Sequence, residues 1–128
     1  EVKRNLIGCK NIKTRVMVNH HHIGLLFVDI LNTLDCTLRK REQIVEQIAG
    51  VEVLFHEATY TEKDADKCKK HTHSTAKQAA QIAKLAGAGK LIIGHFSARE
   101  DDHTVFLNEA KEVFENTVLA IEKETIDI

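Results

Sequence analysis

The chain has 128 residues, about one domain by the usual prior of roughly 100–200 residues per domain. Hydrophobic residues make up 43% and charged residues 29%, which excludes a disordered, collagenous or membrane-spanning chain. The formal net charge is −1, so any site for a polyanion such as a nucleic acid has to be local. Cys9, Cys36 and Cys68 are odd in number and far apart, which argues against a disulfide framework and predicts a cytoplasmic protein.

Histidine is unusually frequent, with eight residues in this length. Some of the histidines cluster, as in the run His20-His21-His22 and the close pair His71 and His73. Imidazole is a common metal ligand and titrates near neutral pH. The clusters therefore favour metal or acid–base chemistry.

The second half of the chain predicts strands that alternate with helices. Apolar periodicity, a capping-box spacing from Thr75 to Gln78 and glycines at Gly50 and Gly87 mark most of the boundaries. The expected elements are a helix over Arg39–Ala49, a strand over Val51–Phe55, one or two helical turns within Thr59–His73, a helix from the Thr75 cap to Gly87, a strand over Lys90–Gly94, a helix over Asp101–Phe114, a strand over Thr117–Ile121 and a further strand within Lys123–Ile128. This alternation predicts an α/β layer with a partly parallel sheet.

The first 43 residues give a weaker pattern. Leu6-Ile7 and Arg15–Val18 are consistent with strands, and Ile23–Leu34 is apolar with mixed periodicity. No internal repeat and no low-complexity linker divides the sequence. We therefore expect a single domain over residues 1–128.

Three short motifs carry the candidate chemistry: His56-Glu57-Ala58-Thr59, His73-Ser74-Thr75 and His95-Phe96-Ser97-Ala98-Arg99. The first and third follow expected strands, whose carboxyl ends meet at one edge of a parallel sheet. A carboxylate beside an imidazole can orient it for proton delivery, an imidazole can bind zinc, and a guanidinium can hold a phosphate. Each residue also has a plainer interpretation, as a buried histidine, a helix cap or a solvated charge.

Together and in this order, the motifs resemble the C-terminal part of ribonuclease Z, the tRNA 3′-processing endonuclease of the metallo-β-lactamase superfamily. The resemblance covers residues 44–128. It implies a metallo-β-lactamase-like αββα sandwich, of which this chain covers mainly the C-terminal half. It also implies two zinc ions, hydrolysis of a phosphodiester after the discriminator nucleotide of precursor tRNA, and a homodimer.

The resemblance further implies roles for individual residues. His95 matches a zinc ligand of the family, and Glu57 and His73 match the pair that protonates the leaving oxygen. The residues that match contacts to the substrate phosphate are Arg99, Ser97, Ser74 and Thr75.

The sequence departs from the family in its metal ligands. The family's His-x-His-x-Asp-His run is absent, and the nearest segment is His20-His21-His22-Ile23-Gly24-Leu25. For the bridging aspartate the closest candidate is Asp35, with Asp29 as the alternative. Because a catalytic zinc takes about three protein ligands, His95 and Asp35 cannot hold two ions.

Three explanations stay open for these missing ligands. The chain is a C-terminal piece of a longer enzyme, a gapped or truncated sequence, or a paralogue without metals. Two functions compete with tRNA processing: a different phosphodiesterase of the same fold, and a metal-free scaffold subunit that pairs with an active partner. The retained Glu57, His73 and His95 argue against the scaffold.

Overall fold

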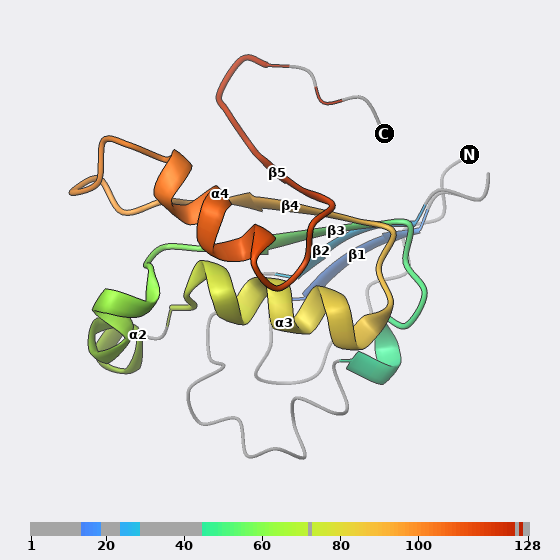
Figure 1. Ribbon diagram of the computed structural model, residues 1–128. Coiled ribbons are helices and arrows are strands. Elements are labelled where there is room, and N and C mark those ends of the chain that lie inside the picture. Colours follow the sequence, from blue (N-terminus) through green and yellow to red (C-terminus); the bar gives the residue numbers. More distant parts are fainter. Residues whose placement is uncertain (1–13, 19–23, 29–44, 72, 125, 127–128) are drawn as a thin grey trace.

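A computed structural model describes residues 14–18, 24–28, 45–71, 73–124 and 126 (Figure 1). Leu6-Ile7, the run His20-His21-His22 and both aspartate candidates, Asp29 and Asp35, lie outside the described residues. The described end of the expected helix over Arg39–Ala49 is helical at residues 45–47. Gly50 follows with a φ of 71°, a left-handed conformation that glycine adopts without steric cost.

The centre of the fold is a five-stranded sheet with the order β1-β2-β3-β4-β5. Its strands are β1 (Thr14–Val18), β2 (Gly24–Val28), β3 (Val53–Glu57), β4 (Lys90–Gly94) and β5 (Thr117–Leu119). β1 and β2 pair antiparallel, and the other neighbours pair parallel, which confirms the predicted partly parallel sheet.

The strand bounds differ from the prediction in places. β4 spans the expected residues, whereas β3 begins and ends two residues later, so that His56 and Glu57 are its last residues. β2 lies inside the stretch whose periodicity was mixed. The expected strand within Lys123–Ile128 is wrong for its described residues, because Lys123, Glu124 and Ile126 are not in a strand.

The helical segments are η2 (Glu62–Asp64), α2 (Ala65–His71), α3 (Ala76–Ala86) and α4 (Thr104–Lys111). The capping box that the sequence predicts is present: the Thr75 hydroxyl accepts from the Gln78 backbone N–H, and the Gln78 side chain accepts from that of Thr75. α4 begins later than expected, where the Asp102 carboxylate accepts from the N–H and hydroxyl of Thr104 in a turn that precedes the helix, and it also ends earlier, at Lys111.

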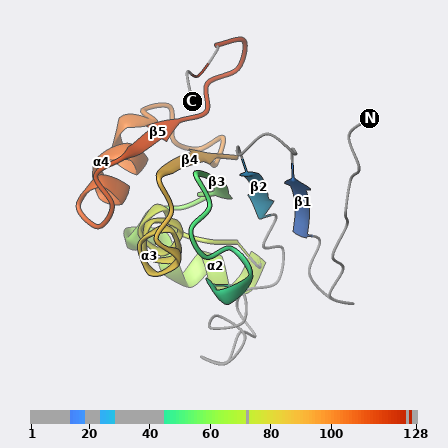
Figure 2. The same cartoon turned by 90° about the vertical axis from the view of Figure 1, so that its right-hand side faces the viewer.

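α3 and α4 pack side by side against one face of the sheet (Figures 1 and 2). The buried face of α3 consists mainly of alanines, which let the helix approach the sheet closely. The core between the layers includes Leu54, Leu91, Ile93, Ala79, Ala83, Phe106 and Ala110. This packing fixes the carboxyl ends of β3 and β4 relative to the beginning of α3.

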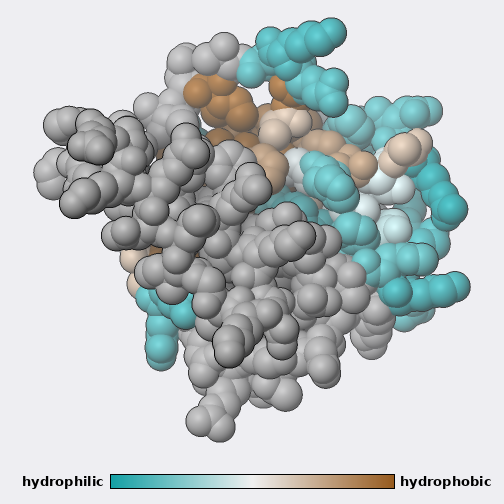
Figure 3. All heavy atoms as spheres, turned by 180° about the vertical axis from the view of Figure 1, so that it is seen from behind, coloured by the Kyte–Doolittle hydropathy of each residue, from teal (hydrophilic) through white to brown (hydrophobic). Residues whose placement is uncertain are grey.

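The other face of the sheet is also apolar. Val53 and Ile92 are buried there by the alternation of the strands, and Phe55 packs over Gly94. A Cβ at Gly94 would lie 2.9 Å from the Phe55 ring, so any larger residue there would have to displace this ring. From behind, hydrophobic side chains gather in one area of the described surface, with hydrophilic residues above and to the right of them (Figure 3). Among the described residues, no helix has the length and apolar character to cross a bilayer.

Candidate active site

The candidate site lies where β3 and β4 end, at the end of the sheet beside α2 (Figure 1). Glu57 is the last residue of β3, and His95 directly follows β4. His73 lies in the short segment between α2 and α3. The structure thus brings three of the predicted site residues to one edge of the sheet, as expected for the carboxyl ends of parallel strands.

Backbone hydrogen bonds hold the segment after β3 between the other two motifs. The Tyr60 N–H donates to the Ser74 carbonyl at 3.3 Å, on the side of His73. The Ser97 N–H donates to the Thr59 carbonyl at 3.0 Å, on the side of His95. These bonds set the register of the two histidines relative to Thr59.

Glu57, Thr59, His73 and His95 form a group that we call the histidine cluster. The Thr59 Oγ1 lies at its centre, 2.7 Å from Glu57 Oε2, 3.2 Å from His73 Nδ1 and 2.9 Å from His95 Nδ1. The centroids of the two imidazole rings are 5.4 Å apart. One hydroxyl therefore contacts every other member of the cluster.

The Glu57 carboxylate is 6% exposed and has three internal donors. Its Oε1 accepts from the Ser74 N–H, and its Oε2 accepts from the Thr59 N–H at 3.0 Å and from the Thr59 hydroxyl. Glu57 Oε2 and His73 Nδ1 are 3.7 Å apart, so the predicted carboxylate–imidazole pair is linked through Thr59 rather than by a direct hydrogen bond. Sequence reasoning did not select Thr59, although it belongs to the motif that contains Glu57.

His95 has a backbone conformation that is costly for its residue type. Its φ is 61°, in the left-handed region, which costs a non-glycine residue roughly 1–2 kcal/mol. Such strain is found at functional sites, where the surrounding contacts maintain it. Here the turn after β4 places the ring within hydrogen-bond distance of Thr59.

The donor set of the cluster fits a transition-metal ion such as zinc. Glu57, His73 and His95 each offer one ligand atom, and these atoms all lie within 4.8 Å of one another. Imidazole nitrogen and carboxylate oxygen are ordinary zinc ligands. Both oxygens of Glu57 already accept hydrogen bonds from the protein, so the two imidazoles are more available as metal ligands.

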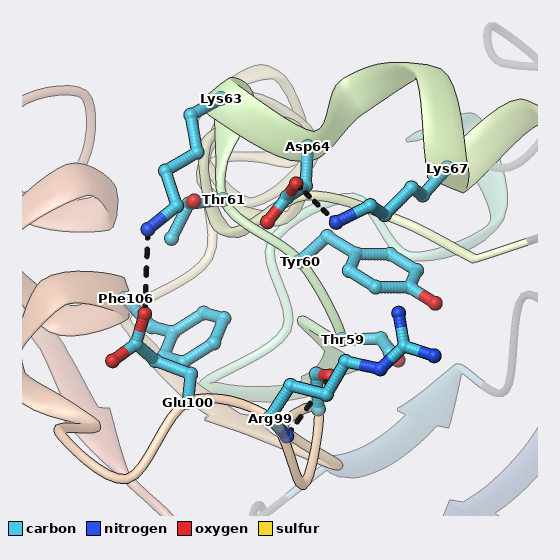
Figure 4. Close-up of a pocket in the computed structure, with 10 residues that line it drawn as sticks. Thr59, Tyr60, Thr61, Lys63, Asp64, Lys67, Arg99, Glu100 and Phe106 are labelled. Atoms are coloured by element: carbon cyan, nitrogen blue, oxygen red, sulfur yellow. Dashed lines mark hydrogen bonds and ion pairs between the residues drawn. The ribbon is translucent and has the colours of Figure 1, made fainter.

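A cavity of about 260 Å³ opens beside the cluster, and we call it the basic pocket (Figure 4). Thr59 belongs to both, since it also lines this cavity. The lining comes from the segment after β3, from η2 and α2, and from the loop before α4 together with Phe106 of that helix. It consists of Thr59, Tyr60, Thr61, Lys63, Asp64, Lys67, Ser97, Arg99, Glu100 and Phe106.

Two of the three cations of the pocket are paired with carboxylates. The Lys67 Nζ donates to Asp64 at 2.6 Å, a hydrogen bond that lowers the pKa of that carboxyl below its ordinary value, and Lys63 lies 3.4 Å from Glu100. Among the described residues, no carboxylate lies within ion-pair distance of Arg99. Its guanidinium extends toward Tyr60 (Figure 4). Arg99 is therefore the cation of this pocket that is available to an anion.

The remaining predicted residues have other surroundings. Ser74 and Thr75 are 2% and 0% exposed, and the Thr75 hydroxyl is used by the helix cap and by Glu62. The Ser97 Oγ is 3.4 Å from the Arg99 backbone nitrogen. His56 is buried, with its Nδ1 2.6 Å from the Glu57 carbonyl oxygen, and is not part of the cluster.

Comparison of sequences identifies related proteins. No protein-family model matches the chain. Ribonuclease Z of Bacteroides fragilis is 51% identical over 88 residues, which cover 69% of this chain and 29% of that protein. Ribonuclease Z of Cytophaga hutchinsonii is 53% identical over 81 residues, which cover 63% of this chain and 26% of that protein. The chain therefore spans less than a third of the length of these relatives.

Solved structures agree on the fold. A metallo-β-lactamase fold protein from Bacillus subtilis superposes with a TM-score of 0.67 at 20% identity, over 83% of this chain and 40% of that chain. The short form of human tRNase Z superposes with a TM-score of 0.64 at 22% identity, over 96% of this chain and 46% of that chain. The matched part of the chain is thus homologous to a part of ribonuclease Z, and the chain has the metallo-β-lactamase fold.

Proposed function

We propose that this protein is a zinc-dependent endoribonuclease that removes the 3′ trailer from precursor tRNA by phosphodiester hydrolysis. The observation that supports this proposal most is the position of Thr59, which joins Glu57, His73 and His95 and also lines a pocket with an available arginine. Groups for proton transfer thereby adjoin a site for a phosphate. The relatives named ribonuclease Z supply the substrate class.

In this proposal His95 contributes one ligand to zinc, and Asp35, outside the described residues, is the proposed aspartate ligand. Two ions per site are expected from the family. When bound, zinc supplies Lewis acidity toward the attacking water and the phosphate oxygens. Because this proposal assigns Glu57 and His73 to proton transfer, it takes the other ligands from residues outside the cluster.

His73 is the proposed general acid. With Glu57 and Thr59 on its Nδ1 side, its Nε2 is the nitrogen from which a proton passes to the leaving oxygen. The products would be a tRNA with a 3′-hydroxyl and a released trailer.

Arg99 is the proposed phosphate contact, because a guanidinium can donate two parallel hydrogen bonds to phosphate. Ser97 supports the loop that carries Arg99. Substrate contacts of Ser74 and Thr75 stay predictions, and their burial favours structural roles. The proposal also includes a homodimer, a cytoplasmic location and a domain of which residues 44–128 form the ribonuclease Z-like part.

The test is cleavage of a precursor tRNA that carries a 3′ trailer, combined with metal analysis of the purified protein. We expect a cut after the discriminator nucleotide, a 3′-hydroxyl product and about two zinc ions per protomer, as the two-metal mechanism requires. If the protein binds zinc and cleaves small phosphodiesters but does not cleave precursor tRNA, it is a different phosphodiesterase of the same fold. Absence of both zinc and cleavage would contradict the proposal and support the scaffold alternative.

A further inference from the structure

The hydrogen bonds around Thr59 can be assigned by counting protons. A hydroxyl has one proton to donate and two lone pairs that accept, and an ionised carboxylate can only accept. The Thr59 proton therefore goes to Glu57 Oε2, at 2.7 Å. Because the proton is used there, both imidazoles must donate to the hydroxyl through their Nδ1 atoms.

We propose that Thr59 is a positioning residue that holds His73 and His95 in the Nδ1–H tautomer, with Glu57 fixing the direction of its hydroxyl. Each neutral ring then presents the lone pair of Nε2. The hydroxyl makes all three of its possible hydrogen bonds, so it has no alternative arrangement that keeps the Glu57 contact.

The surroundings of Thr59 give it little freedom. The residue is 6% exposed, and its own N–H also donates to Glu57 Oε2, at 3.0 Å. Its carbonyl accepts from the Ser97 N–H. Since these backbone bonds do not involve the hydroxyl, replacing the side chain by one of the same shape should leave the segment in place.

The functional consequence rests on the proposed function. For His95, the fixed tautomer presents Nε2 to a metal ion, as an outer hydrogen bond to a metal-binding imidazole commonly does. For His73, a proton taken up at Nε2 can be given to the leaving oxygen, and the ring returns to the same Nδ1–H form. One hydroxyl would thus prepare a ligand and a general acid together.

The first measurement needs no substitution. Nitrogen-15 NMR of the intact, chelator-treated protein at about pH 8, above the imidazole range, reports which ring nitrogen carries the proton. We expect Nδ1–H for both His73 and His95. Finding Nε2–H at either residue would overturn the proposal.

The second measurement compares Thr59→Val, which puts a methyl group in place of the hydroxyl, with Thr59→Ser, which keeps the hydroxyl. We expect the Val variant to shift both rings toward the Nε2–H form and to bind zinc about 10–100-fold more weakly, the usual effect of losing such an outer partner. The Ser variant should keep the ring tautomers and the zinc affinity of the unaltered protein. The proposal would be contradicted if the Val variant kept its tautomers and zinc affinity. It would also be contradicted if the Ser variant changed them as the Val variant does.

Thr61→Val is the matched control, because Thr61 lies in the same pocket and its hydroxyl bonds to neither histidine. It should leave the tautomers of both rings as they are in the unaltered protein. These readouts do not depend on the RNA substrate. If precursor tRNA is not cleaved but the tautomers respond as described, the proposed function fails and the role of Thr59 stands.

Discussion

The histidine cluster and the basic pocket share Thr59 but are built differently. In the cluster, the Glu57 carboxylate accepts three hydrogen bonds from the protein, the Thr59 hydroxyl contacts three side chains, and the backbone is hydrogen-bonded on both sides. In the pocket, the cations are on exposed side chains, and Lys63 and Lys67 form ion pairs at the surface. Surface pairs of this kind contribute little free energy and are easily rearranged.

This difference in construction fits two separate functions: metal binding and proton transfer in the cluster, and substrate binding in the pocket. A general acid and a metal ligand must be held in a fixed geometry to act, and hydrogen bonds to the buried residues Glu57 and Thr59 can hold the half-buried His73 and the exposed His95. Capture of an anionic substrate needs charge and reach, which flexible lysine and arginine side chains supply. Substitutions in the cluster should therefore affect metal binding and turnover, and substitutions in the pocket should affect substrate affinity.

The largest effect is expected for His95→Ala, which should lose bound metal as well as activity. Removal of a metal that stabilises several kcal/mol of transition-state charge corresponds to a loss of roughly 10³-fold or more in kcat. Zinc content by atomic absorption and kcat measure the two effects. His95→Asn, which tolerates the positive φ, guards against a folding defect, and His103→Ala is the control. Full metal occupancy in the His95 variants would exclude this residue as a ligand.

A separate loss of turnover is expected for His73→Ala. Removing a general acid lowers kcat by roughly 10²–10⁴-fold. Zinc content should stay the same, since the proposed role of His73 is proton transfer. A substrate with a more acidic leaving group should recover part of the rate. If the variant instead loses zinc, His73 is a ligand, and the division of roles within the cluster is wrong.

A smaller effect is expected for Arg99→Ala, which changes the basic pocket instead of the histidine cluster. Loss of one exposed phosphate contact should raise KM about tenfold with little change in kcat. The dependence of log KM on log salt concentration should also become less steep by about one. Lys84→Ala is the matched control, because it removes one positive charge from the exposed face of α3. A fall in kcat with unchanged KM would place Arg99 with the cluster instead.

The smallest effect concerns Cys68, a buried free thiol on α2, the helix that also carries Lys67. Burial raises the pKa of this thiol to about 12 from an ordinary value of 9.0. Above pH 9.0 the unfolded chain loses this proton and the folded chain keeps it, so the free energy of unfolding falls as pH rises toward about 12.

Denaturant unfolding at several alkaline pH values, with and without Cys68→Ala, measures this contribution. The Ala variant should lose stability less steeply than the unaltered protein over that range, because Cys9 and Cys36 are common to both. Parallel curves for the two proteins would show that the Cys68 thiol ionises in the folded state as it does in the unfolded chain.

Much of the fold could be predicted from sequence, because local rules determine it. The Thr75 capping box, the alanine face of α3 and the apolar run of β4 each depend on residues close in the chain. The later end of β3 could not be predicted, because His56 and Glu57 are polar residues that the strand buries. Burial of polar residues in a strand depends on partners that are distant in sequence.

The candidate site likewise has residues that the sequence predicts and contacts that it does not. Glu57, His73 and His95 follow from motifs, and the structure brings them together. The central position of Thr59 depends on three side chains that meet only in the folded chain. Likewise, the ion pair between Lys63 and Glu100 joins η2 to the loop before α4, so the sequence did not show that Arg99 is the pocket's available cation.

The position of zinc in crystals of the zinc-loaded protein, located by anomalous diffraction, tests the proposed role of His95 directly. We expect an ion bonded to Nε2 of His95 at about 2.0–2.1 Å, with Nδ1 of the same ring still hydrogen-bonded to the Thr59 hydroxyl. An ion bonded to Nδ1 in place of Thr59, or no ion near His95, would contradict it.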